Sequence, residues 1–116
     1  MQIIQKPVNL ELLWQQRQVE FKDMIKAVVD VEQGILAVDA ELHSDLENLL
    51  LEMGSQQRAL WGINIYPHLQ PDQMIEFTSF INIRPSQDNC SMEVQDEGLR
   101  QRIHQICATL LVRDAK

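Results

Sequence analysis

The sequence has few cysteines and no long apolar run. Its two cysteines, Cys90 and Cys107, are too few and too far apart for a disulfide framework or a CxxC motif. No apolar stretch approaches the ~20 residues needed to cross a bilayer, and the N-terminus lacks the basic start and apolar stretch of a secretory signal. These features predict a cytoplasmic protein without a membrane-spanning segment.

The common signatures of catalysis and nucleotide binding are also missing. With four glycines, the chain has no GxGxxG or GxxxxGK[ST] phosphate loop. No GxSxG surrounds Ser86 or Ser91, so neither serine has the context of a nucleophile. The sequence therefore assigns no catalytic residue and no cofactor, and leaves open whether the protein is an enzyme.

Basic residues are outnumbered by acidic ones, 10 to 17, which gives a formal net charge of −7. Affinity for nucleic acid comes largely from lysines and arginines that neutralise phosphates, and the sequence contains no cluster of them. Nucleic-acid binding is therefore disfavoured.

What the chain does contain predicts one globular domain spanning residues 1–116, of which 45% are hydrophobic. Asn9 and Asp96 are placed to cap the first and last helices, and the apolar spacing of the first helix extends to Phe21. Between them, residues 26–31 and 35–38 predict a hairpin around Gly34. A second amphipathic helix covers residues 42–53 and ends at Gly54, where a left-handed cap belongs.

A second hairpin is predicted from the alternation of Trp61, Ile63 and Ile65 with polar or small residues. Residues 60–66 and 75–83 form its strands, and the last strand places Ile75 and Ile83 on one face. With a short strand at residues 2–5, the order is β-α-β-β-α-β-β-α. This order indicates an α+β fold, with an antiparallel sheet built from two hairpins and helices mainly on one face.

The polar face of the second hairpin and the loop after it form a candidate ligand site. Its residues carry amides, hydroxyls and one guanidinium: Asn64, Tyr66, Asn82, Arg84, Ser86, Gln87 and Asn89. Arg84 could hold a small anionic ligand through its planar donor fork. The alternative is that Asn82 and Asn89 bond backbone groups of the loop, with Arg84 paired to a carboxylate such as Glu93.

His43 and Glu47 are four residues apart in the second helix and so share a helical face. This spacing lets a helix offer an imidazole and a carboxylate to one metal ion. No HExxH motif supports the site. The alternative is a solvated acidic first turn that the helix dipole favours.

Four motifs resemble a family of small bacterial proteins of unknown function, which includes cyanobacterial members. The motifs begin at Lys26, Glu41, Leu60 and Ile81, and they read KAVVDVE, ELH, LWGINIYP and INIRPSQ. The resemblance covers nearly the whole chain and implies no established activity, cofactor or catalytic residue.

Two functional hypotheses follow from these observations. The first is a cytosolic binding or interaction protein whose ligand or protein partner contacts the loop after the last strand. The second is a small metal-dependent enzyme that uses His43 and nearby carboxylates. Trp14 and Phe80 further predict a homo-oligomer, because a small domain with unpaired sheet edges and surface aromatics often associates through them.

Overall fold

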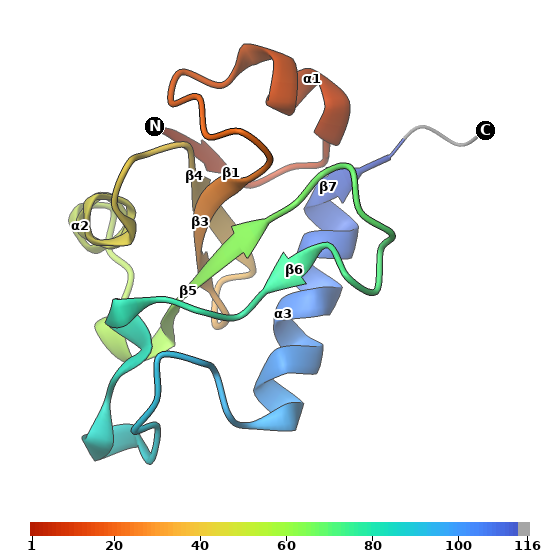
Figure 1. Cartoon of the computed structure of the whole chain (residues 1–116). Helices are drawn as coiled ribbons and strands as arrows, with labels where there is room; N and C mark the ends of the chain where they lie inside the picture. Colours follow the sequence, from red (N-terminus) through yellow and green to blue (C-terminus); the bar gives the residue numbers. More distant parts are fainter. Residues whose placement is uncertain (114–116) are drawn as a thin grey trace.

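The computed structural model describes residues 1–113, and its centre is a five-stranded antiparallel sheet (Figure 1). The strands lie in the order β1-β4-β3-β5-β6. Their bounds are Gln2–Ile4 for β1, Ile25–Asp30 for β3, Ile35–Val38 for β4, Leu60–Ile65 for β5 and Ile75–Glu76 for β6. The predicted α+β class and both antiparallel hairpins are confirmed, with β3 also paired to β5 along its whole length.

The helices occupy both faces of this sheet (Figure 1). Their bounds are Leu10–Gln16 for α1, His43–Glu52 for α2 and Glu97–Leu110 for α3. Leu13 of α1 and Ile103 of α3 pack with Ile63 of β5 in one core, whereas Leu46 and Leu50 of α2 pack in a second core. Two helices thus share one face, as expected, and α2 covers the other. The central strands are consequently buried on both sides.

A parallel pair of short strands joins the two ends of the described chain. Strand β2, Val8–Asn9, pairs with β7, Leu111–Val112, directly after α3. The pair holds the start of α1 beside the end of α3. Neither strand was predicted, because two residues are too few to show a periodic pattern.

Local sequence signals determine where several elements begin and end. The side chain of Asn9 accepts a hydrogen bond from Leu12 N at 2.9 Å, and Asp96 accepts one from Gly98 N at 2.9 Å. Gly34 and Gly54 have φ values of +70° and +101°, a conformation that side chains with a Cβ rarely adopt. The predicted caps at Asn9 and Asp96 and the predicted turn and helix end at Gly34 and Gly54 are therefore confirmed.

Two predicted elements were too long. Helix α1 ends at Gln16, which leaves Phe21 in the following loop. The predicted strand 75–83 ends at Glu76, and the chain then forms the short 3₁₀ helix η2, Phe80–Asn82. The reason is a change of partner, because Phe77 O accepts from Val94 N at 3.0 Å and Ser79 N donates to Met92 O at 3.0 Å.

Two further 3₁₀ turns complete the fold, η1 at Gln57–Ala59 before β5 and η3 at Pro85–Gln87 in the predicted ligand loop. Within the described residues, none of the helices has the length and apolar content required to span a membrane.

Candidate functional site

Strand β5 separates the predicted site residues into two groups, one at each end of the strand. Arg84, Asn82 and Asn89, with Glu47 of α2, lie at its start and are called the Arg84 cluster. The Glu76 cluster consists of His43, Asn64, Tyr66 and Glu76 and lies at its end. The structure therefore divides both the predicted ligand site and the predicted metal pair between two places.

Arg84 is 9% exposed, and its guanidinium is surrounded by acceptors from the chain itself. Nε donates to Ile81 O at 3.0 Å, and Nη1 donates to Gln57 O at 2.8 Å and to Gln87 Oε1 at 3.4 Å. Nη2 donates to Leu60 O and, at 3.4 Å, to Glu47 Oε2. An anion at Arg84 would have to displace these bonds.

Asn82 and Asn89 hold the same region through backbone groups. Asn82 is fully buried; its Oδ1 accepts from Gly62 N at 2.8 Å, and its Nδ2 donates to Gly62 O at 3.0 Å. Strand β6 pairs only with Asn64 and Ile65 of β5. At Gly62, the side-chain amide of Asn82 therefore makes the hydrogen bonds that a neighbouring strand would otherwise make. The Nδ2 of Asn89 donates to Asn82 O at 2.8 Å and to Glu93 O at 2.9 Å. These are the loop bonds that the alternative interpretation of the sequence described.

The acidic partner of Arg84 is Glu47, and not Glu93 as in the example given from the sequence. Glu93 pairs with Arg100 at 3.3 Å, and Arg84 pairs with Glu47, which is nearly as buried as the arginine. Burial lowers the pKa of Arg84, and the Glu47 carboxylate raises it in return. The pair joins α2 to the loop after η2.

Ser86 and Gln87 lie on the exposed turn η3. Gln87 Nε2 donates to Arg58 O at 3.0 Å, and this hydrogen bond helps to fix the loop against η1. Whether either residue contacts a ligand stays a prediction.

The Glu76 cluster is a hydrogen-bond network on the α2 face of β5 and β6. Asn64 is 8% exposed, and its Nδ2 donates to Glu76 Oε1 at 2.7 Å. The Tyr66 hydroxyl donates to the same oxygen at 3.2 Å. Burial raises the pKa of Tyr66, and the carboxylates of Glu76 and Asp23 raise it further. The phenol is therefore a hydrogen-bond donor at neutral pH.

His43 lies behind this network, at the first position of α2. Its Nε2 is 2.8 Å from Ile63 O, and a carbonyl can only accept, so Nε2 carries the proton. Burial lowers the pKa of His43 below the ordinary value of 6.5, although the Ile63 carbonyl and the Asn64 side chain favour the charged form. The ring is therefore neutral at pH 7. The Oδ1 atom of Asn64 is buried and has no hydrogen-bond partner within residues 1–113.

The two residues of the predicted metal pair bond to different partners. His43, in the Glu76 cluster, bonds to Ile63 O, and Glu47 bonds to Arg84 in the Arg84 cluster. Over the part of the chain that the structure describes, no group of three or more His, Cys, Asp or Glu side chains could hold a metal ion. The metal hypothesis therefore rests on the sequence spacing alone.

An open groove of about 640 Å³ adjoins the Glu76 cluster and is called the Glu76 groove. Its polar lining comes from Tyr66, Gln73, Glu76, Thr78, Glu93 and Arg100, and its apolar lining from Leu69, Ile75 and Phe77. The groove runs along the short strand β6, at the edge of the sheet. Two predicted ligand residues, Asn64 and Tyr66, thus lie at or directly behind a concave surface.

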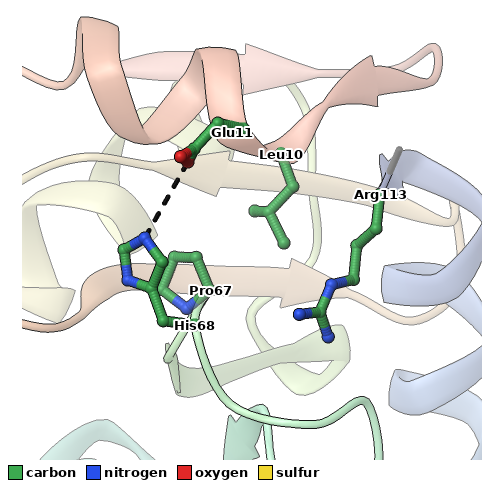
Figure 2. Close-up of a pocket in the computed structure, with 5 residues that line it drawn as sticks. All are labelled: Leu10, Glu11, Pro67, His68 and Arg113. Atoms are coloured by element: carbon green, nitrogen blue, oxygen red, sulfur yellow. Dashed lines mark ion pairs between the residues drawn. The ribbon is translucent and has the colours of Figure 1, made fainter. Parts of the chain in front are cut away.

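A second hollow lies between α1, the turn after β5 and the end of the described chain (Figure 2). It has a volume of about 270 Å³ and is lined by Leu10, Glu11, Pro67, His68 and Arg113. His68 Nε2 lies 3.8 Å from Glu11 Oε2. This polar hollow adjoins an apolar cavity of about 350 Å³ through the shared side chain of Arg113.

Sequence reasoning placed Glu76 on the polar face of the second hairpin but did not include it among the candidate site residues, and it missed the hollow beside Arg113. The signal for Glu76 was present, because alternation places it on the polar face of the second hairpin with Asn64. No local pattern connects residues 11, 68 and 113, which only the tertiary fold brings together.

Residues 2–110 match the model of a family described as protein of unknown function, DUF5674. No curated protein and no solved structure matches the chain. The chain belongs to the DUF5674 family, as the resemblance indicated.

Proposed function

We propose that this member of a family without an assigned function is a binding protein for a small organic cation, an amine or a guanidinium, in the Glu76 groove. The observation that carries the proposal is the orientation of Glu76. Its Oε1 accepts from Asn64 Nδ2 at 2.7 Å and from Tyr66 Oη at 3.2 Å, so the carboxylate is oriented before a ligand arrives. Preorganised groups lose less conformational freedom on binding.

The charge of the groove supports a cation. Glu93 is paired with Arg100 at 3.3 Å, whereas Glu76 forms no ion pair with another side chain of residues 1–113. Glu76 is therefore the uncompensated charge at the groove surface. The net charge of −7 also attracts cations over longer distances.

The chemistry of the lining indicates amines and guanidinium groups among possible cations. A carboxylate with hydroxyls beside it, here Tyr66 and Thr78, offers oxygen acceptors to several N–H donors. An N–H cation can donate to Glu76 while the apolar lining contacts its carbon chain. Charge-assisted bonds of this kind are roughly twice as strong as neutral ones.

The test is calorimetric titration with n-butylamine and n-butylguanidine, using acetate as a probe of the opposite charge. We expect both cations to bind and acetate not to bind. Glu76→Gln keeps the side-chain shape and removes the charge, so it should weaken cation binding by about ten-fold or more.

Glu52→Gln, at an exposed position of α2 outside the groove, is the matched control and should bind as the wild type does. Equal binding of butylamine and acetate would contradict the proposal. So would cation binding that Glu76→Gln leaves unchanged.

Self-association and a cytoplasmic location remain our predictions for this chain. Phe80 is 77% exposed and Ile83 is 45% exposed, which supports an apolar contact surface on and beside η2. Trp14 gives less support, because its ring already packs against two side chains of the same chain. Arg17 Cζ lies 3.5 Å from the centroid of the Trp14 ring, and the centroid of the His68 ring lies 5.0 Å from it. Light scattering at micromolar concentration should give a mass above 13.5 kDa, and Phe80→Ser should lower it.

A further inference from the structure

An apolar cavity separate from the Glu76 groove lies between the second half of α3 and the connection from β5 to β6. Its volume is about 350 Å³, within the range of small-molecule sites. Met74, Ile75, Cys107 and Leu111 form buried parts of its wall, and Pro71, Ala108 and Val112 complete the apolar lining. His104 and Arg113 supply its polar lining groups.

Arg113 stands at the boundary between this cavity and the polar hollow of Figure 2, because it lines both. Its Nη1 donates to Leu69 O at 2.8 Å, which fixes the guanidinium against the loop. This bond uses one of the five N–H donors of the group. A ligand in the apolar cavity would therefore have a positioned cation at one end.

The acidic residue of the polar hollow lies away from Arg113. Glu11 lies at the opposite side of the hollow, beside His68, at an Nε2–Oε2 distance of 3.8 Å (Figure 2). Leu10 lies between this pair and the guanidinium in the same view. Among the described residues that line the two hollows, the charged side chain at their boundary is therefore the cation Arg113.

We propose that this cavity binds a small carboxylic acid with an apolar body, such as a medium-chain acid. The body occupies the space beside Met74, Cys107 and Leu111, and the carboxylate accepts from Arg113. Guanidinium and carboxylate match in shape, since two parallel N–H bonds meet two oxygens. The burial of apolar surface and the charge-assisted contact with Arg113 both contribute to the affinity. An anion without an apolar body makes only the second contribution.

The test is calorimetric titration of the full chain with octanoate, beside 1-octanol and acetate. Octanoate should bind more tightly than either control, because the alcohol lacks the charge and acetate lacks the apolar body. Arg113→Gln should weaken octanoate binding by about ten-fold and leave the affinity for 1-octanol unchanged.

A second variant tests the cavity itself without disturbing the core. Ala108 is exposed at the cavity wall on α3, so Ala108→Leu adds side-chain volume there and keeps a good helix former. It should abolish octanoate binding. Thr109→Leu, at the neighbouring exposed position outside the cavity lining, is the control and should bind octanoate normally.

Circular dichroism establishes that each variant is folded before titration. Octanoate binding that survives Ala108→Leu would overturn the proposal, and so would octanoate and 1-octanol binding with equal affinity. Failure of the wild-type protein to bind octanoate would also overturn it. None of these results depends on the Glu76 groove, whose expected ligands are cations.

Discussion

The two ends of β5 carry polar clusters of opposite character. At its start, the Arg84 cluster bonds almost entirely to backbone groups, and Asn82 and Arg84 take the place of strand partners that β6 is too short to provide. At its end, the Glu76 cluster joins the side chains of Asn64, Tyr66 and Glu76 to one another. It leaves one buried acceptor on Asn64 without a partner in the described chain and presents a carboxylate to a groove. Polar residues that are fully satisfied internally stabilise a fold, whereas incompletely satisfied ones mark candidate sites.

The largest expected difference between the clusters concerns Arg84. Arg84→Ala should lower the free energy of unfolding by roughly 3–5 kcal/mol. It leaves the largely buried Glu47 carboxylate without its cation and leaves several backbone carbonyls without a hydrogen-bond donor. Urea denaturation measures the change. Arg58→Ala is the control: Arg58 pairs with Glu32 at 3.2 Å in solvent, so its loss should cost about 1 kcal/mol or less. If Arg84→Ala lowers the free energy of unfolding by less than about 1 kcal/mol, Arg84 is not a structural tie and remains a candidate ligand-binding residue.

One asparagine from each cluster provides the next comparison. Asn82→Ala should cost about 2–4 kcal/mol, because it leaves buried backbone groups of Gly62 and Met92 without partners. Asn64→Ala should cost about 1 kcal/mol, because it also removes the unpartnered Oδ1. Equal losses in thermal and urea unfolding would show that the two clusters do not differ as described.

Gly62, between the clusters, should tolerate no side chain. A Cβ at this position would lie 2.5 Å from Ser79 Cβ, and the overpacking of Gly62→Ala should cost about 1–3 kcal/mol. Gly98→Ala is the matched control, because its Cβ would meet Asp96 Oδ1 at an ordinary 3.4 Å inside a helix. That control should change stability by about 1 kcal/mol or less, in the stabilising direction.

The smallest expected effect is a pH dependence of the Glu76 cluster. Burial lowers the pKa of His43 in the folded state, so the unfolded chain binds a proton more readily. The stabilisation from the neutral ring is complete above the ordinary pKa of 6.5 and is lost as the pH falls from there toward the lower folded-state value. His43→Gln keeps an N–H donor for Ile63 O and should reduce the slope of unfolding free energy against pH in this window.

The sequence predicted well those features that depend on neighbouring residues. Caps at Asn9 and Asp96, the turn at Gly34 and the end of α2 before Gly54 each require one or two residues of fitting chemistry, and all four are present. The strand 75–83 was predicted too long, because its alternation continues past the point where residues 77–79 change partner to residues 92–94. Local periodicity does not show which other segment of the protein a strand pairs with.

The candidate sites show the same limit more strongly. The sequence identified Asn64, Tyr66, Asn82 and Arg84 as more polar than a strand and its following loop require, and the structure places all four in hydrogen-bond networks. It grouped them as one surface, since they are neighbours on one predicted hairpin. The early end of β6 instead turns Asn82 and Arg84 inward to complete the edge of β5.

By itself, the sequence determined the α+β class, the two antiparallel hairpins, the helix caps and the excess of acidic charge. Each of these depends on composition or on contacts within a few residues. Only the tertiary structure decided that His43 and Glu47 belong to different clusters, that Glu76 faces a groove, and that residues 11, 68 and 113 line one hollow. These arrangements depend on strand order and helix packing, which long-range burial selects and no local spacing specifies.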